Sequence, residues 1–130
     1  MRPHAKRIVA ALALAVAATL AFAQAPGIKR TLLQRIDVGE NREAILGLAE
    51  IAPGAAAGRH THPGVEFGYV VEGSASLEIE GETPRLLKPG DSYMIPAGKV
   101  HDAKTVGEQP AKVLATYVVD KGKPLASPAP

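Results

Sequence analysis

Apolar and polar residues alternate along short stretches of the chain from Gln24 onward, and Gly or Pro separates these stretches every several residues. The alternation is strict from Ser76 to Glu80, which is the pattern of a strand with one face in water. Turn-forming runs such as Gly39-Glu40-Asn41 and Gly81-Glu82 lie between neighbouring stretches. The pattern predicts strands at 31–38, 43–51, 66–72, 74–80, 84–88, 92–95, 102–105 and 112–120.

Short strands with turns at this spacing predict an all-β domain, either a sandwich or a barrel. The chain of 130 residues fits one domain, which we place at 24–120, and neither a repeat nor a second domain is evident. Residues 121–130 include Pro124, Pro128 and Pro130, so this segment is expected to be a flexible tail.

The N-terminal segment 1–23 has the pattern of a signal peptide. Basic residues precede the stretch 8–23, which carries no charge and ends in the small-residue pattern Ala21-Phe22-Ala23. An uncleaved membrane anchor is the alternative, but a spanning helix needs about 20 apolar residues and this stretch is shorter. We therefore expect a periplasmic or secreted protein with no membrane association after cleavage. His4 lies in this leader and is set aside as a ligand.

Composition and charge exclude several classes of site and partner. The chain has no Cys, so disulfides, thiolate metal sites and Cys nucleophiles are excluded. Loss of Arg2, Lys6 and Arg7 with the leader would change the formal net charge from +2 to −1, and no basic run exists elsewhere. Electrostatics therefore give no reason to expect nucleic acid as a partner.

Three histidines follow the leader, and two of them form the pair His60-Thr61-His62. Residues two apart in a strand point to the same face, and Glu66 has the same parity. His101 follows the turn at 96–98. Three imidazoles and one carboxylate can hold a divalent transition metal such as Fe, Mn, Ni, Co, Cu or Zn. A lone His-x-His pair, however, is also typical of a surface or capping pair.

The residues around the histidines form a framework of glycines and prolines. Its members, together with the ligand candidates, are Gly54, His60, His62, Glu66 and Gly73, followed by Gly90, Pro96, Gly98 and His101. These two segments, 54–73 and 90–105, resemble the two motifs of the cupin superfamily. Thr105 departs from the usual terminal Asn of the second motif, but it is neither a ligand nor a turn residue. The resemblance implies a single small antiparallel β-barrel, the double-stranded β-helix or jelly roll.

The resemblance also implies a metal site, with His60, His62, Glu66 and His101 as its ligands. In the quercetin-dioxygenase-like small cupins, such a glutamate doubles as a proton acceptor, so Glu66 is the candidate catalytic residue. This predicts an exported metal-binding protein with dioxygenase activity on a small metal-chelating organic substrate. The superfamily hosts many activities on one fold. A non-catalytic metal- or ligand-binding protein is the alternative, and no further acid–base pair supports an isomerase or epimerase.

The remaining candidates have structural interpretations. Tyr69, Tyr93 and Tyr117 are expected in the core or at the rim rather than in acid–base roles. Asp102 follows His101 and thus faces the opposite side of a strand, so we expect it to be exposed. Cupin barrels often pair through N-terminal strands, which makes 31–38 a candidate homodimer element, although the same strand could close its own barrel.

Overall fold

The computed structural model describes residues 25–130, which fold into strands and turns without a helix. This confirms the all-β prediction for that part of the chain, and no helix in it could cross a membrane. The predicted leader 1–23, with His4, lies outside the described residues. The strands are β1 (Ile28–Asp37), β2 (Arg42–Ile51), β3 (His60–Thr61), β4 (Gly64–Glu72), β5 (Ser74–Ile79), β6 (Arg85–Leu87), β7 (Ser92–Ile95), β8 (His101–Val106), β9 (Ala111–Asp120) and β10 (Ser127–Pro128).

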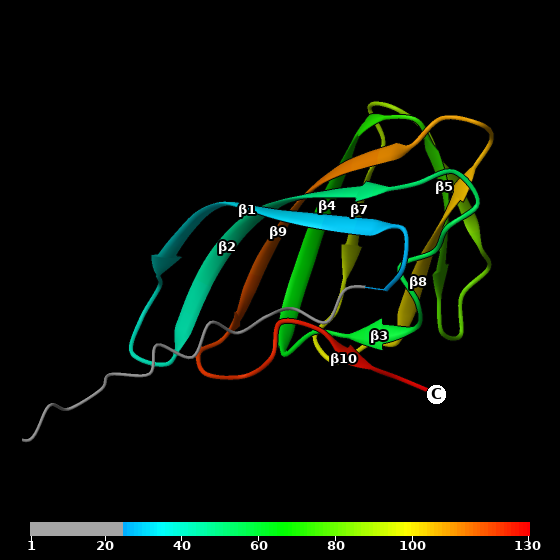
Figure 1. Ribbon diagram of the computed structural model, residues 1–130. Helices are drawn as coiled ribbons and strands as arrows, with labels where there is room; N and C mark the ends of the chain where they lie inside the picture. The colour runs from blue at the N-terminus through cyan, green and yellow to red at the C-terminus, as the bar shows by residue number, and fades with distance from the viewer. Residues whose placement is uncertain (1–24) are drawn as a thin grey trace, which may run out of the picture.

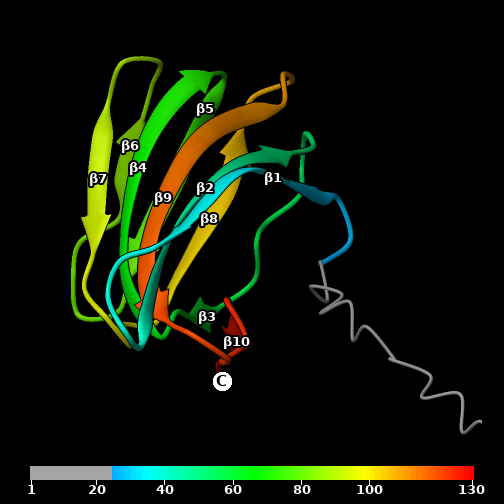
Figure 2. The same cartoon turned by 90° about the vertical axis from the view of Figure 1, so that its left-hand side faces the viewer.

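The strands form two antiparallel five-stranded sheets that face each other (Figures 1 and 2). One sheet has the order β1-β2-β9-β4-β7, and the other has the order β10-β3-β8-β5-β6. The sequence had led us to expect a single small barrel, but the strand pairing of residues 25–130 does not run continuously around a closed barrel. It divides into two ladders, because short turns carry the chain from one sheet to the other. The arrangement is consistent with a jelly roll.

The turn at Gly73 shows how the chain changes sheets. Gly73 has a φ of +69° and joins β4 of one sheet to β5 of the other. A Cβ atom at this position would collide with the backbone of Pro110 and Ala111. Only glycine tolerates both the left-handed conformation and this close approach. A turn at Gly73 is therefore present, but the hairpin that the sequence suggested there is wrong, because β4 and β5 belong to different sheets and do not pair.

The core lies between the sheets and is built from inward positions of alternating strands. β5 and β9 show the alternation most regularly, with every second residue buried. One cluster of buried aliphatic side chains fills the region between β4, β5, β6, β7 and β9; its members are Val70, Leu77, Ile79, Leu87, Ile95 and Val113. This cluster will be called the aliphatic core.

The C-terminal segment 121–130 is packed against the sheets, and our prediction of a flexible tail is wrong. Its strand β10 pairs with β3, and Leu125 is buried in a cluster with Ile45 and Tyr117. The backbone N–H of Ala129 donates to the carbonyl of Arg59 at 3.0 Å. Prolines disfavour the interior of a sheet but tolerate its edge, and β10 is an edge strand.

Candidate metal centre

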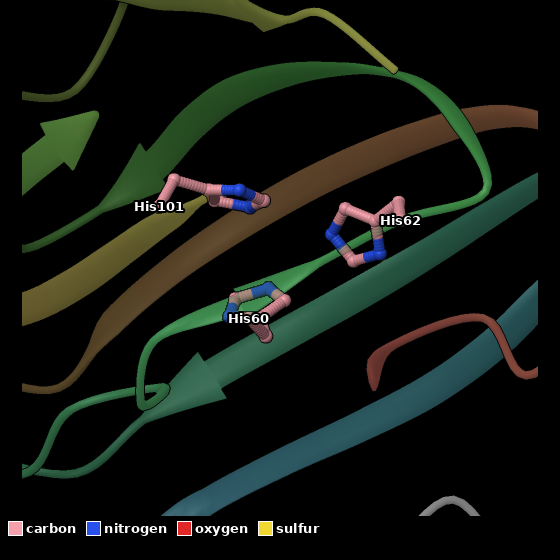
Figure 3. Close-up of side chains that lie close together, drawn as sticks. All are labelled: His60, His62 and His101. Carbon is pink, nitrogen blue, oxygen red and sulfur yellow. The ribbon is translucent and has the colours of Figure 1, made fainter. Parts of the chain in front are cut away.

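Three histidines from two neighbouring strands converge between the sheets. His60 begins β3, His62 follows directly after that strand, and His101 begins β8. β3 and β8 pair with His60 opposite His101. The candidate ligand nitrogens of the three side chains lie within 4.8 Å of one another, and all three residues are buried. Figure 3 shows the three rings pointing toward one another.

Each of the three imidazoles is held by a backbone carbonyl at its Nδ1 atom. Nδ1 lies 2.6 Å from the Gly58 carbonyl in His60, 2.6 Å from the Leu125 carbonyl in His62 and 2.9 Å from the Lys99 carbonyl in His101. A carbonyl only accepts, so Nδ1 carries the proton and donates. The Nε2 lone pairs are then left to face the centre, which is the tautomer that metal-binding histidines use.

Glu66 reaches the same centre from β4. Its Oε2 atom lies 2.9 Å from His62 Nε2 and 3.2 Å from His101 Nε2. Its Oε1 atom accepts a hydrogen bond of 2.7 Å from the Tyr93 hydroxyl. The structure therefore brings together all four residues predicted as ligands, and it adds Tyr93 as the partner of the carboxylate.

The four side chains fit a metal ion. His62 Nε2 and Glu66 Oε2 are buried and have no hydrogen-bond partner within residues 25–130. Unsatisfied buried polar atoms are costly, and a cation between them would satisfy both. Two ligand atoms at about 2.1 Å from a metal and about 90° apart are separated by about 3 Å. The two contacts of Glu66 Oε2 match that spacing.

The electrostatics keep the donors in the protonation states that a metal requires. Burial lowers the pKa of His60 to about 4, so its ring is neutral at physiological pH. Burial acts to raise the pKa of Glu66, whereas hydrogen bonds and positive charge from protonated His101 and His62 hold it well below its usual range; with Nδ1 carrying the ring proton, a bound cation would take over that role. Burial raises the pKa of Tyr93 well above 10, so the phenol stays a hydrogen-bond donor.

Two hollows adjoin the site. A small cavity of about 40 Å³ lies between the sheets and is bounded by His60, Glu66, His101 and Tyr93, among others. A wider cleft of about 320 Å³ opens beside His60 and is bounded by the segment 57–59 and by β10. His60 borders both hollows, so the cleft lies next to a candidate ligand of the metal centre.

Tyr93 and Tyr117 lie in the core, as predicted, but the sequence did not indicate that both also contact the site. Tyr93 contacts Glu66, and the buried Tyr117 packs its ring edge against His62 with the ring centroids 4.8 Å apart. Only Tyr69, which is half exposed, lies away from the site. Gly68 gave a usable signal: it lies two residues after Glu66 on the same face, and any side chain there would collide with the Tyr93 ring.

The structure corrects the prediction that Asp102 is exposed. The residue points away from the metal centre, as strand parity requires, but it is buried rather than exposed, with 6% of its surface accessible. β8 is the middle strand of its sheet, so neighbours on both sides enclose this short side chain. Its Oδ1 has no hydrogen-bond partner in the described part of the chain.

Sequence comparisons identify the family. The Cupin domain family matches residues 47–117. The tetracenomycin polyketide synthase protein TcmJ of Streptomyces glaucescens is 30% identical over 108 residues, which cover 82% of this chain and 71% of that protein. The polyketide synthase CurC of Streptomyces cyaneus is 37% identical over 89 residues, or 68% of this chain and 56% of that protein.

Solved structures show the same fold. An RmlC-like cupin from Shewanella frigidimarina is 26% identical with a TM-score of 0.60, over 74% of this chain and 79% of the other. The DMSP lyase DddQ from Ruegeria pomeroyi superposes with a TM-score of 0.66 at 23% identity, over 78% of this chain. The chain spans 51% of the lyase and 56% of CurC, about half the length of each. With its family match and these relatives, the chain belongs to the cupin family.

Proposed function

We propose that this chain is an exported mononuclear metal-binding cupin with dioxygenase activity on a small metal-chelating organic substrate. The observation that carries the proposal is the convergence of three carbonyl-held imidazoles and a carboxylate beside a small cavity and a wider cleft. Fold alone would not support an activity. The donor set and its placement do.

The metal ligands in this proposal are the Nε2 atoms of the three histidines and Glu66 Oε2. Imidazole and carboxylate donors suit Fe, Mn, Ni, Co, Cu or Zn. A divalent transition metal there would supply Lewis acidity toward a substrate hydroxyl or enol, and a redox-active one would supply reactivity toward dioxygen. The overall reaction would place both atoms of dioxygen in the substrate.

Glu66 would move the proton. Its carboxylate Oε2 is directed at the centre, where it could accept the proton that a chelating hydroxyl or enol loses on binding. The hydrogen bond from Tyr93 to Oε1 fixes the carboxylate and leaves Oε2 directed at the histidines. Gly68 leaves room for the Tyr93 ring, so the three residues act as one unit. The buried surroundings limit access of water to this unit.

Dioxygen uptake by the metal-loaded chain 24–130 tests the activity. The substrates would be a panel of flavonols, catechols and diketones, each with one metal of the series. We expect uptake with at least one pair and its loss in Glu66→Gln, which keeps the shape of the side chain. Glu78→Gln is the matched control, because Glu78 lies on β5 and pairs with Lys104 at the surface. Uptake that persists in Glu66→Gln would contradict the proposed proton acceptor.

A non-catalytic metal-binding protein is the competing function. It shares the metal centre but predicts no turnover. Tight metal binding without dioxygen uptake across all metals and substrates would favour it over the dioxygenase.

Export is a separate part of the proposal. It rests on the segment 1–23, with its charge-free stretch and Ala21-Phe22-Ala23 end. Expression of the full chain in a Gram-negative host should yield a periplasmic protein that begins at Gln24, as N-terminal sequencing would show. A chain that keeps Met1 in the cytoplasmic fraction would contradict export.

We also propose a homodimer that pairs through β1. Leu33, Ile36 and Val38, on β1 and just beyond its end, expose 41%, 65% and 45% of their surfaces. Exposed apolar groups of this kind are typical of contact surfaces. Light scattering should give twice the monomer mass for the wild type and a monomer for Ile36→Lys. A monomeric wild type would contradict the proposal.

A further inference from the structure

One charged side chain occupies an inward position beside the metal centre. Arg30 lies on β1, where the alternating pattern sends it inward with Ile28 and sends Lys29 outward to pair with Glu50. In register, Arg30 faces Ala49, which in turn faces Val113. Arg30 is a cation in an otherwise aliphatic row, and it is partnered within the protein, where it contacts the Tyr117 phenol.

Arg30 borders both hollows at the site. It lines the cleft beside His60, and it also lines the small cavity that contains Glu66. Only His60 and Ala57 share that position with it. A molecule bound in the cleft beside His60 would therefore meet the guanidinium group.

The charge of Arg30 affects the pKa of residues around the site. Burial lowers the pKa of His60, and Arg30 adds to the lowering. Burial raises the pKa of Tyr117, and Arg30, which contacts that phenol, opposes the rise. Arg30 therefore lies within electrostatic reach of residues on both sheets.

The cleft has a positive lining. Arg30 and Arg59 are the charged residues that border it, and no carboxylate of the described chain does. Arg59 is held at the rim by the Pro130 carbonyl at 2.6 Å and by Glu80 at 3.2 Å. With a divalent metal bound, the positive charges of the metal and of Arg30 would exceed the single negative charge of Glu66. Such a site favours an anion.

We infer that the substrate is an organic anion whose carboxylate binds Arg30 while its other oxygen donors reach the metal centre. The planar guanidinium offers donors that match a carboxylate in a bidentate pair. The inference rests on the proposed metal-binding function and narrows its substrate class. Arg30 already contacts Tyr117, but a guanidinium has five N–H donors and can hold a carboxylate as well. Arg59 lies at the rim, where it attracts the anion at longer range rather than fixing it.

Binding of matched acids and amides to the metal-loaded chain 24–130 tests the inference. The probe pairs are glycolate and glycolamide, malonate and malonamide, and 3,4-dihydroxybenzoate and its amide. Calorimetry should show at least one acid binding about tenfold or more tightly than its amide. Arg30→Gln should weaken that acid by about 10- to 100-fold and leave the amide unchanged.

Two further variants separate binding from folding. Arg35→Gln removes the same charge from the same strand at a position that pairs with Glu43, and it should leave the preference for the acid intact. Arg30→Lys keeps the charge without the bidentate geometry and should restore part of the affinity. If Arg30→Gln does not fold, the comparison between Arg30→Lys and Arg35→Gln still decides. Acids that bind no better than amides, or not at all, would overturn the inference, as would equal losses in the Arg30 and Arg35 variants.

Metal content and dioxygen uptake distinguish this inference from the proposed function. If the metal-loaded protein oxidises neutral substrates and binds acids and amides equally well, the proposed function stands and the inference of an anionic substrate is wrong. If an acid binds in a way that depends on Arg30 but no dioxygen is taken up, the inference of an anionic ligand stands and the dioxygenase activity is wrong. A protein that binds no metal would refute the metal-binding premise and, with no Arg30-dependent acid binding, the inference as well.

Discussion

β4 and β5 are joined by the single residue Gly73, yet they use their inward positions in opposite ways. β5 buries Ala75, Leu77 and Ile79 and turns its polar residues outward. β4 buries Glu66, Gly68 and Val70, while its aromatic residues Phe67 and Tyr69 are about half exposed.

The difference separates packing from function within one fold. On β5 the inward residues exclude water and stabilise the sheets. On β4 the three inward residues have different roles. Glu66 belongs to the metal centre, Gly68 leaves room for the Tyr93 ring, and Val70 belongs to the aliphatic core. A strand that buries its polar residue and exposes its aromatic residues gives up packing energy, and the metal centre explains why.

The largest expected effect is a loss of metal affinity when one of the histidine ligands is removed. His62→Ala should lower metal affinity by more than about 100-fold, because it removes a donor whose Nδ1 is already fixed by the Leu125 carbonyl. Competition with a chelating indicator would measure the loss. Thr61→Ala is the control and should bind metal as the wild type does. Unchanged affinity in His62→Ala would remove this residue from the ligand set.

The aliphatic core should respond in the opposite way. Leu87→Ala should lower the free energy of unfolding by about 2–5 kcal/mol, because Leu87 is 2% exposed and leaves a cavity. Metal affinity should change by less than about threefold, since Leu87 borders neither hollow at the site. Urea denaturation of the metal-free protein gives the first quantity.

Leu86→Ala is the matched control for the core. Leu86 precedes Leu87 on β6 but is 52% exposed, so its loss should cost less than about 0.5 kcal/mol. Equal destabilisation by the two substitutions would contradict the assignment of inward and outward faces on β6.

The C-terminal segment joins the two regions, and its removal should weaken the site. A chain that ends at Asp120 loses β10 and the carbonyl that holds His62. Metal affinity should fall by about 10- to 100-fold, the usual effect of losing a group that orients a ligand. Lys123→Ala, which removes only a surface ion pair with Asp120, should have no such effect. Full affinity in the truncated chain would show that the Leu125 carbonyl does not orient His62.

The smallest expected effect is a pH dependence of the metal-free protein. The pKa of His60 is about 4 in the folded chain against 6.5 for a free histidine. The unfolded state therefore binds more protons between these values, so stability should fall as pH drops from 6.5 toward 4. The contribution is at most about 2 kcal/mol, because the ring borders an open cleft. Urea denaturation at several pH values should show a shallower slope in His60→Asn; an identical slope would contradict the lowered pKa.

Local patterns predicted the regular parts of this molecule. The strict alternation at 76–80 lies in β5, and the turn residues Gly73 and Gly90 have the positive φ that their turns require. The spacing of His60, His62, Glu66 and His101 predicted four residues that the fold brings together. Neighbours along the chain impose the geometry of the strand and of the turns, whereas the resemblance to the two cupin motifs placed His101 with the other ligands.

The mistaken predictions, and the Tyr93 contact that the sequence did not predict, involve contacts between distant segments. Residues 121–130 were expected to be flexible from their prolines, but Leu125 finds a buried place that no local pattern encodes. Tyr93 contacts Glu66 only because β7 pairs with β4, 27 residues apart in sequence. Asp102 is buried by its position in the middle strand of its sheet. Sheet order decides all three outcomes, and sheet order is a property of the whole fold.

Elemental analysis of the exported protein tests the central claim most directly. Protein purified from the periplasm should carry about one equivalent of a transition metal per chain, and His62→Ala should carry almost none. Periplasmic rather than cytoplasmic material matters, because metal availability outside the cytoplasm would decide which ion fills the site. Less than about a tenth of an equivalent of every transition metal in the wild type would contradict the metal centre.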